Sequence, residues 1–426
     1  MPGFCAIDFG TSNSAIALPA ADSVALVPIE GGERTMPTAV FYNVEGLAPH
    51  EEPQRHYGRA AIAAYVEGVD GRLMRSMKSV LGSTLADEAT DVGEGRSVRY
   101  IDVVSGYLRH LKRLAEAQHG GALDAVVLGR PVFFVDDDPR RDAAAQAALQ
   151  RAARDAGFVD IAFQYEPIAA ALNHETTLQR EQLVLVADIG GGTSDFSLVR
   201  LGPQRRARVE RADDILANHG LHVAGTDFDR HIELNSILPA CGYRGVGPNG
   251  REVPSKVYFD LATWHLINTV YAPARIAELA GMKSFHADAR QHTRLMTVLH
   301  RRLGHALIAQ AEAAKIALAD GGRTVLDLHA VEAGLQVALD ASQATAAVAD
   351  DLQRVVDAAQ QTLRLAGVSR GQVDALYFTG GSTGLQALAQ RLAAAFPAAQ
   401  AMRGDRFASV ATGLGVFASR LFGAAG

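Results

Sequence analysis

The stretch QLVLVADIGGGTSDFSLVRLG at residues 182–202 decides the fold of this chain. It reads as an apolar strand that ends in Asp188, a tight turn of glycines and hydroxyl residues, and a second apolar strand. The same pattern occurs near the start of the chain, where AIDFGTSNSAIAL at residues 6–18 carries Asp8 at the end of its first strand. Internal repetition at this distance predicts two related lobes rather than a solenoid of short repeats.

Strands and helices alternate on both sides of these two hairpins. Short β-rich runs between turn residues predict antiparallel strands over residues 4–44, and a further strand is expected around Arg208. Apolar periodicity predicts helical regions at about 102–117, 139–156, 261–318 and 410–421, and buried strands at 124–135 and 375–379. This alternation predicts an α/β protein with a duplicated fold, in which each lobe holds a mixed sheet flanked by helices.

The repeat also indicates how the chain is divided. At 426 residues, the chain is long enough for two or three domains with full cores. Lobe I is expected over residues 1–182, and lobe II over residues 183–402 with a helical subdomain around 241–320. Residues 403–426 are expected to form a C-terminal helix that packs back towards lobe I.

Composition excludes several kinds of partner and site. A formal net charge of −6 argues against binding to nucleic acid or to an anionic membrane, since both need concentrated Lys and Arg. The sequence has no secretory signal pattern and no run of about 18 apolar residues, so a cytoplasmic location is expected. Cys5 and Cys241 lack a CxxC partner, which argues against a disulfide framework or a zinc site. The basic cluster Arg205, Arg206 and Arg208 is interpreted as a solvated hairpin tip.

The two repeated turns have the composition of phosphate-binding loops. An Asp at the end of a strand, followed by Gly and hydroxyl residues, lets the backbone turn sharply and point several N–H groups into one concavity, where phosphate oxygens fit. Because Mg²⁺ prefers oxygen ligands and keeps most of its waters, Asp8 and Asp188 are predicted to face the ion through its hydration shell from opposite lobes. A single turn of this kind also occurs as an ordinary hairpin with an Asx turn. Two copies in two repeated units favour a binding site.

Two other turns are candidates for the same site. Gly380, Gly381 and Ser382 lie between the strand ALYFT and a helix, which places backbone N–H groups at a helix N-terminus. Gly225 precedes an Asp-capped helix in HVAGTDFDRHI. Helix capping alone also explains both turns.

Two charged residues outside the turns need separate consideration. Glu166 opens a helix with Pro167 in its first turn, which is a sufficient structural role, although a carboxylate at this place can also orient metal-bound water. Lys78, in RSMKSVLG, has the local sequence of an ordinary surface lysine. The sequence contains no HExxH or P-loop pattern, which argues against zinc proteases and P-loop nucleotide binding.

Several short motifs of the sequence resemble those of one protein family. They are AIDFGTSNS, SMKSVLG, YEPIAAAL, DIGGGTSDFSLV, GTDFDRHI, EAAK and FTGGST, and they follow the family's order from residue 4 to residue 384. The chain resembles the nucleotide-binding domain of the seventy-kilodalton heat-shock chaperones, within the superfamily of actin, sugar kinases and heat-shock ATPases, and is most similar to the short YegD-type members. The resemblance implies an actin-like ATPase fold with ATP or ADP and Mg²⁺ in the cleft between the lobes.

The resemblance also implies roles for the residues that match the family's motifs. The residues expected to contact the phosphates and the nucleoside are Gly10, Thr11, Ser12, Asn13, Gly190, Gly191, Gly192, Thr193, Gly225, Gly380, Gly381 and Ser382, with Glu312 and Lys315 at the ribose. Asp8 and Asp188 would hold hydrated magnesium. The residues expected around the attacking water are Lys78, Glu166, Asp188 and Asp195. Phosphoryl transfer depends mainly on positioning and charge neutralisation, which suits a lysine with metal-oriented carboxylates.

The chain departs from the family pattern at several places. Gly384 and Ile316 stand where the family has two arginines that flank adenine, and Ala224 and Ala319 replace other small residues near the nucleotide. Phosphate recognition is therefore expected to be intact and nucleoside recognition to be altered. The sequence ends at RLFGAAG, so the family's peptide-binding domain is not expected. Residues 241–302 match the family least and represent either a divergent helical subdomain or a partner-binding elaboration.

The leading hypothesis is a slow ATPase or an ATP-dependent conformational switch with a chaperone-related role, which presents a changed surface to a protein partner of unknown identity. Two alternatives stay open: a small-molecule kinase with an acceptor pocket, and an actin-like protein that polymerises with nucleotide. The joint occurrence of EAAK, GTDFD and GGST ranks both below the chaperone-like hypothesis.

Overall fold

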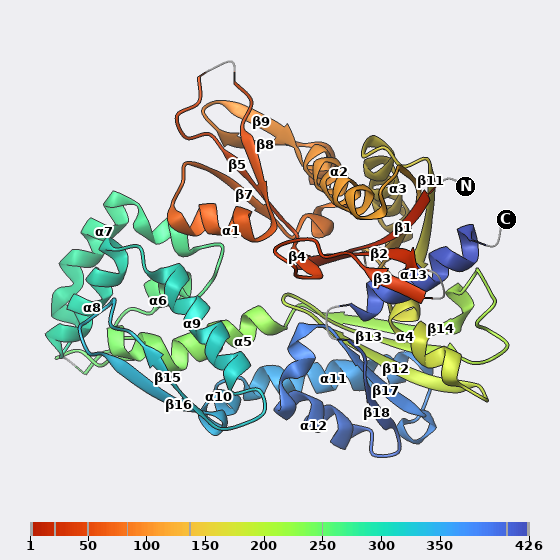
Figure 1. The fold of residues 1–426 in the computed structure, drawn as a ribbon. Helices are drawn as coiled ribbons and strands as arrows, with labels where there is room; N and C mark the ends of the chain where they lie inside the picture. Colours follow the sequence, from red (N-terminus) through yellow and green to blue (C-terminus); the bar gives the residue numbers. More distant parts are fainter. Residues whose placement is uncertain are drawn as a thin grey trace.

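The structure of the protein is a computed structural model that describes residues 3–20, 23–48, 51–82, 84–135, 138–248, 250–405 and 408–423. The chain folds into two lobes, each built on a mixed sheet with helices against its faces (Figure 1). The predicted α/β architecture is thereby confirmed, whereas the lobe boundaries taken from the sequence stay predictions. None of the helices in the described ranges is both long and apolar enough to cross a membrane.

The sheet of lobe I has the strand order β11-β10-β1-β2-β3, with β4 paired to β2. Its strands are β1 (Gly3–Phe9), β2 (Asn13–Ala20), β3 (Ser23–Leu26), β4 (Thr35–Pro37), β10 (Leu123–Arg130) and β11 (Asp160–Tyr165). β1, β10 and β11 run parallel, and β2 is antiparallel to β1, β3 and β4. The near-continuous burial of β10 is what a parallel strand covered on both faces requires.

The sheet of lobe II repeats this plan in the order β14-β13-β12-β17-β18. Its strands are β12 (Gln182–Ile189), β13 (Ser194–Leu201), β14 (Ile215–Leu221), β17 (Ala375–Thr379) and β18 (Gln400–Arg403). β12 pairs antiparallel with β13 and parallel with β17, as β1 does with β2 and β10. The prediction of a strand around Arg208 is wrong, because residues 203–211 form a loop and β14 begins only at Ile215.

Two helices lie between the sheets of the two lobes. α4 (Glu166–Thr177) and α13 (Ser409–Phe422) pack against each other, and α13 also packs against β1, β2 and β10. Their apolar side chains share one buried cluster with strands of both lobes. Small residues permit a close approach of the two helices, since a Cβ at Gly413 would lie 1.8 Å from the Ala169 carbonyl oxygen. This helical layer joins the lobes.

The remaining faces of the two sheets are covered by longer helices. In lobe I these are α2 (Tyr100–His119) and α3 (Pro139–Asp155), and in lobe II they are α11 (Ala349–Ala366) and α12 (Gln386–Ala395). α3 begins where the sequence predicts, because the Asp138 side chain accepts a hydrogen bond from the Arg141 N–H and Pro139 takes the first helical position.

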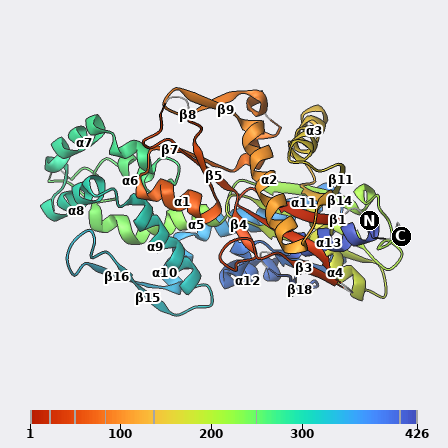
Figure 2. The ribbon, with the colours of Figure 1, turned by 45° about the horizontal axis from the view of Figure 1, so that its top comes forward.

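Each lobe also carries a smaller subdomain (Figure 2). In lobe I it comprises β5 (Ala39–Asn43), β6 (Gln54–Tyr57), α1 (Gly58–Glu67), β7 (Gly71–Arg75), β8 (Ala89–Gly93) and β9 (Arg96–Arg99). In lobe II it comprises α5 (Gly225–Ile232), α6 (Lys256–Leu261), α7 (Pro273–Ala280), α8 (Ala289–His300), α9 (Gly304–Ala317), β15 (Arg323–Asp327), β16 (Gln336–Asp340) and α10 (Ala341–Ala347). The two subdomains meet where the rings of Tyr65 and Trp264 stack with their centroids 5.0 Å apart.

Candidate functional site

The two repeated turns have the same backbone hydrogen bond. In the first turn the Gly10 N–H donates to the Asn13 carbonyl at 3.1 Å, and in the second the Gly190 N–H donates to the Thr193 carbonyl at 2.9 Å. A Cβ at Gly10 would lie 2.3 Å from the Asn13 carbonyl oxygen, so the first turn requires glycine at its start. At Gly190 the corresponding distance is 3.7 Å, which is ordinary contact.

The strands that flank these turns also pair in the same register. Asp8 stands opposite Ala15, and Asp188 stands opposite Asp195. Both Asp8 and Asp188 are the last residue but one of their strands. Opposite the two aspartates, the hairpins therefore differ, because Asp195 occupies the position that Ala15 holds in lobe I.

The two turns face each other across the space between the lobes. A Cβ at Gly191 would lie 2.8 Å from the Ser12 hydroxyl oxygen, although the two residues belong to different lobes. At Gly192 an added Cβ would meet no atom of the described residues within 4 Å, so this glycine borders open space. Thr11 is half-buried and Asn13 is exposed. The predicted phosphate-loop residues are thus brought together by the fold.

The second turn is braced by the two other turns that the sequence singles out. The Ser382 hydroxyl donates to the Gly190 carbonyl at 2.7 Å, and the Gly225 N–H donates to the same oxygen at 3.2 Å. Gly380 has a φ of +85°, which favours glycine, and it leads into the short helix η9 (Gly381–Gly384). All four predicted turns therefore meet at one place.

Lys78 lies inside the site rather than on the surface. It belongs to the short helix η1 (Met77–Val80), is 8% exposed, and forms an ion pair with Glu166, the first residue of α4. Burial opposes the charged form of Lys78, but the negative charges of Glu166, Asp8 and Asp195 outweigh it, so the pKa of Lys78 is raised. The ammonium group therefore stays charged among these carboxylates.

The carboxylates of the site are crowded enough to resist ionisation. Burial, followed by the charge of Glu166, raises the pKa of Asp8 to about 7, with Lys78 acting in the opposite direction. Burial and the charges of Asp195, Glu166 and Asp8 raise the pKa of Asp188 to about 8. A divalent cation would relieve this excess of negative charge, so the residues fit Mg²⁺. Within the described ranges no group of three His, Cys, Asp or Glu residues is placed to ligate a metal directly.

The residues expected at the ribose lie on α9, beside the second turn. Lys315 donates to the Gly225 carbonyl at 3.2 Å and pairs with Asp229 at 2.6 Å, whereas Glu312 is exposed. Burial raises the pKa of Asp229 to about 6, and Lys315 acts against this rise. The sequence analysis missed Asp229, although it lies one helical turn after Gly225 in GTDFDRHI, on the same face of α5.

Comparison with known proteins identifies the family. The family model described as Hsp70 protein matches residues 4–235, which is more than half of the 426-residue chain. The chain belongs to the Hsp70 family. The resemblance read from the motifs of the sequence is thereby confirmed.

The curated relatives of this Hsp70 family member are named as chaperones. Chaperone protein HscA of Serratia proteamaculans (strain 568) is 26% identical over 398 residues, which cover 88% of this chain and 51% of the relative. The HscA homolog of Shewanella sp. (strain ANA-3) is 25% identical over 438 residues, covering 98% of this chain and 58% of the relative. Chaperone protein DnaK of Thermosipho melanesiensis (strain DSM 12029 / CIP 104789 / BI429) is 31% identical over 229 residues, covering 53% and 34%. The chain spans about half the length of the two HscA relatives.

Proposed function

We propose that this Hsp70 family member binds ATP and ADP with Mg²⁺ in the cleft between its lobes, hydrolyses ATP slowly, and acts as a nucleotide-dependent conformational switch in a chaperone-like role. The observation that carries this proposal is the pair of matching turns that face each other, each preceded by an aspartate. Backbone N–H groups in such turns suit phosphate oxygens, and a crowded set of carboxylates suits a divalent cation. We propose a cytoplasmic location.

The phosphates are assigned to the two facing turns. The proposed donors are the backbone and hydroxyl groups of Gly10, Thr11, Ser12, Asn13, Gly190, Gly191, Gly192 and Thr193, with Gly225, Gly380, Gly381 and Ser382 completing the nucleotide site. Asp8 and Asp188 would hold Mg²⁺ through its waters from opposite lobes. When bound, the ion would neutralise negative charge on the phosphates and on these carboxylates.

The residues proposed to act on the attacking water are the ones that the fold gathers around Asp188. Lys78 would place its ammonium charge next to the terminal phosphate, and its ion pair with Glu166 holds that carboxylate in place to orient the water and accept its proton. Asp195 stands opposite Asp188 and is proposed as a second orienting carboxylate. Phosphoryl transfer needs this positioning and charge compensation more than covalent chemistry.

Glu312 and Lys315 are proposed to contact the ribose. The Lys315 ammonium is already held beside the second turn by Asp229 and the Gly225 carbonyl, which supports a place next to the nucleoside. A protein partner or client is proposed because the curated relatives are named chaperones, and closure of the lobes would change the surface that such a partner meets.

Calorimetric titration of the nucleotide-free protein with Mg–ATP, Mg–ADP and Mg–GTP tests this proposal. We expect saturable binding of ATP and ADP, weakened by about 10-fold or more in Asp188→Asn because that carboxylate helps to hold the hydrated ion. Asp357→Asn, an exposed position on α11, is the matched control and should bind as wild type does. Failure of the wild-type protein to bind any nucleotide would contradict the proposal and leave the turns with a structural role alone.

A further inference from the structure

The ion pair between Glu166 and Lys78 is built within lobe I. Glu166 follows directly on β11 of the lobe I sheet. Lys78 lies on η1, in the segment between β7 and β8 of the lobe I subdomain. Since one lobe carries both residues, their pairing does not depend on how the two lobes are arranged, and its geometry must come from neighbours in lobe I.

The end of β10 supplies the wall on which the Glu166 side chain rests. A Cβ at Gly129 would lie 3.2 Å from the Glu166 Cγ, 3.3 Å from its Oε1 and 3.1 Å from Cδ1 of the buried Leu414. Such distances are tighter than ordinary van der Waals contact, so an alanine would have to displace Glu166 or Leu414 by a few tenths of an ångström. The missing side chain of Gly129 is therefore part of what places the carboxylate.

Arg130, the next residue, ties the same strand end to its surroundings on the opposite face of the sheet. Its side chain, 12% exposed, pairs with Asp142 of α3 at 2.9 Å and donates to the Val132 carbonyl at 3.1 Å. It also lies over the ring of Tyr165, with its Cζ 5.1 Å from the ring centroid, and Tyr165 immediately precedes Glu166. Arg130 therefore holds the residue from which Glu166 leaves β11.

The start of α3 reaches the segment that carries Lys78 as well. The Arg141 side chain donates to the Gly82 carbonyl at 2.9 Å, two residues after η1 ends at Val80. A Cβ at Gly82 would lie 2.2 Å from the Val135 Cγ2, so this segment passes close to the loop between β10 and α3. The end of β10 and the start of α3 therefore contact the supports of both partners in the ion pair.

We infer that Gly129 and Arg130 are positioning residues for the Glu166 carboxylate. Gly129 leaves room for it, and Arg130 fixes Tyr165 and the start of α3. The pair with Lys78 is thereby formed within lobe I before any nucleotide binds. This inference deepens the proposed function and rests on it only where ATP turnover is measured.

The main test variant removes Arg130 and its carboxylate together, so that no lone buried charge remains. Arg130→Met with Asp142→Leu retains apolar volume, and the chain is expected to stay folded. Gly129→Ala, a milder variant, crowds the Glu166 carboxylate directly. These two are called the β10 variants below.

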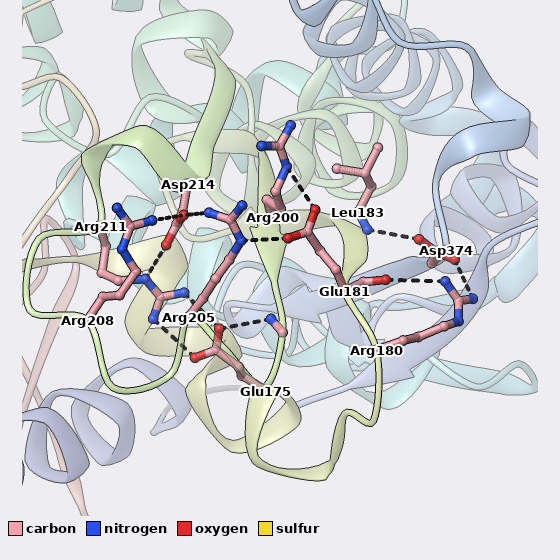
Figure 3. Close-up of polar contacts among 11 residues, drawn as sticks. Glu175, Arg180, Glu181, Leu183, Arg200, Arg205, Arg208, Arg211, Asp214 and Asp374 are labelled. Atoms are coloured by element: carbon pink, nitrogen blue, oxygen red, sulfur yellow. Dashed lines mark hydrogen bonds and ion pairs between the residues drawn. The ribbon is translucent and has the colours of Figure 1, made fainter.

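A second buried arginine pair, at the far end of α4, provides a matched control (Figure 3). Arg211, 2% exposed, makes a two-pronged ion pair with Glu175 at 2.8 and 3.1 Å. Glu175 stands nine residues after the start of α4, so at 1.5 Å of rise per residue this pair lies about 13 Å along the helix from the candidate site. Glu175 also accepts the Gly202 N–H at 3.1 Å, as Asp142 accepts the Phe134 N–H at 2.6 Å. Arg211→Met with Glu175→Leu therefore makes an equivalent change away from the site.

The surroundings of this control pair also correct the interpretation of the basic cluster as a solvated hairpin tip. Arg205 and Arg208 both pair with the buried Asp214 (Figure 3). Arg206 donates to the Leu178 carbonyl at 3.4 Å, at the carboxyl end of α4, where positive charge is favourable to the helix dipole. The basic residues therefore make ion pairs and hold the end of this helix.

Nuclear magnetic resonance of the nucleotide-free protein reads the inference without any need for catalysis. The chain has five lysines, so isotope-labelled lysine gives few side-chain signals, and Lys78→Gln identifies the signal of Lys78. Glu166→Gln supplies the position of that signal when the ion pair is lost. We expect both β10 variants to move the Lys78 signal towards that position and the control to leave it unchanged. A Lys78 signal unmoved in both β10 variants, or moved equally in the control, would overturn the inference.

Turnover measurements supply the second readout. We expect Arg130→Met with Asp142→Leu to lose about 10-fold in kcat and Gly129→Ala about threefold, because small displacements of a catalytic group are costly. The Kd for Mg–ADP should stay within about twofold of wild type, since the phosphate turns are untouched. In a Glu166→Gln background the same substitutions should cause no further loss.

Losses that multiply in the combined variants, or a parallel loss of ADP affinity, would show a general structural role and overturn the inference. Since the resonance measurement does not depend on ATP, its result is separable from failure of the proposed function.

Discussion

The turns of lobe I and lobe II share one backbone hydrogen bond but differ in the residues that surround them. The first turn is held from behind by Thr38, whose N–H donates to the Ser12 carbonyl at 2.9 Å and whose hydroxyl is hydrogen-bonded to that of Ser14 at 2.8 Å. The second is braced by Ser382 and Gly225, and its strand pair carries Asp195 as an additional carboxylate. The two lobes therefore share the hydrogen bond that closes each turn, whereas the side chains around the turns differ between the lobes.

The largest expected effect comes from making the second hairpin resemble the first. Asp195→Ala installs the residue that lobe I has at the equivalent position, Ala15. If Asp195 orients the attacking water, the rate of phosphate release should fall by about 10²-fold or more, which is typical for loss of such a group. Calorimetry should show an affinity for Mg–ADP within about threefold of wild type. Unchanged turnover would contradict the proposed role of Asp195.

The two glycines that open the turns provide a comparison of backbone tolerance. An alanine at Gly10 would force its Cβ to 2.3 Å from the Asn13 carbonyl oxygen, whereas at Gly190 the nearest approach is 3.7 Å. We expect Gly10→Ala to lower the free energy of unfolding by about 3 kcal/mol and Gly190→Ala to lower it by less than about 1 kcal/mol. Urea titration of the metal-free proteins measures both values. Equal losses of unfolding free energy in Gly10→Ala and Gly190→Ala would contradict the expected difference between the two turns.

The two aspartates should differ in how they link stability to pH. Their pKa values are raised in the folded protein from the ordinary 3.8 to about 7 for Asp8 and about 8 for Asp188. At pH values between the unfolded and the folded pKa of each aspartate, the unfolded chain binds fewer protons than the folded one. The free energy of unfolding of the metal-free protein therefore falls as pH rises from about 4 to 8. Asp188→Asn should remove part of this fall, on the order of 2 kcal/mol, and Asp8→Asn should remove less.

Urea unfolding in the presence of a chelator, at about pH 5, 6.5 and 8, measures this linkage. If the free energy of unfolding changed with pH in the same way in wild type and both variants, the proposed linkage to Asp8 and Asp188 would be contradicted. Added Mg²⁺ should reduce the difference between wild type and Asp188→Asn, because the cation offsets the same excess of negative charge.

The smallest expected effect concerns the nucleoside side of the site. Ile316 is 65% exposed on α9, beside Lys315, and Gly384 is buried at the end of η9. An arginine at position 316 would offer a cation to the face of a base, which contributes about 0.5–1 kcal/mol at exposed sites. Ile316→Arg should therefore raise the affinity for Mg–ATP by about two- to fivefold. Leu365→Arg, exposed on α11, is the control, and an equal gain there would point to a general charge effect.

Sequence reasoning succeeded where the signal is local. The Asp–Gly–hydroxyl turns, the strands on either side of them and the start of α3 depend on residues within a few positions of one another, and the structure has all of them where they were expected. The strand expected around Arg208 failed for the opposite reason. Arg205 forms an ion pair with Glu181, which lies 24 residues earlier in the chain, and both Arg205 and Arg208 pair with Asp214. The non-local pair with Glu181 accompanies a loop rather than a strand in this segment.

The sequence by itself determined the duplicated hairpins, the α/β class and the family, because each follows from patterns that repeat or match over short distances. Tertiary structure alone decided that Lys78 is buried against Glu166 and that Arg211 meets Glu175 near the end of α4. The partners in each of these pairs are separated by dozens of residues along the chain. Such pairings arise only when burial brings unlike charges together, since an isolated buried charge is too unfavourable to persist.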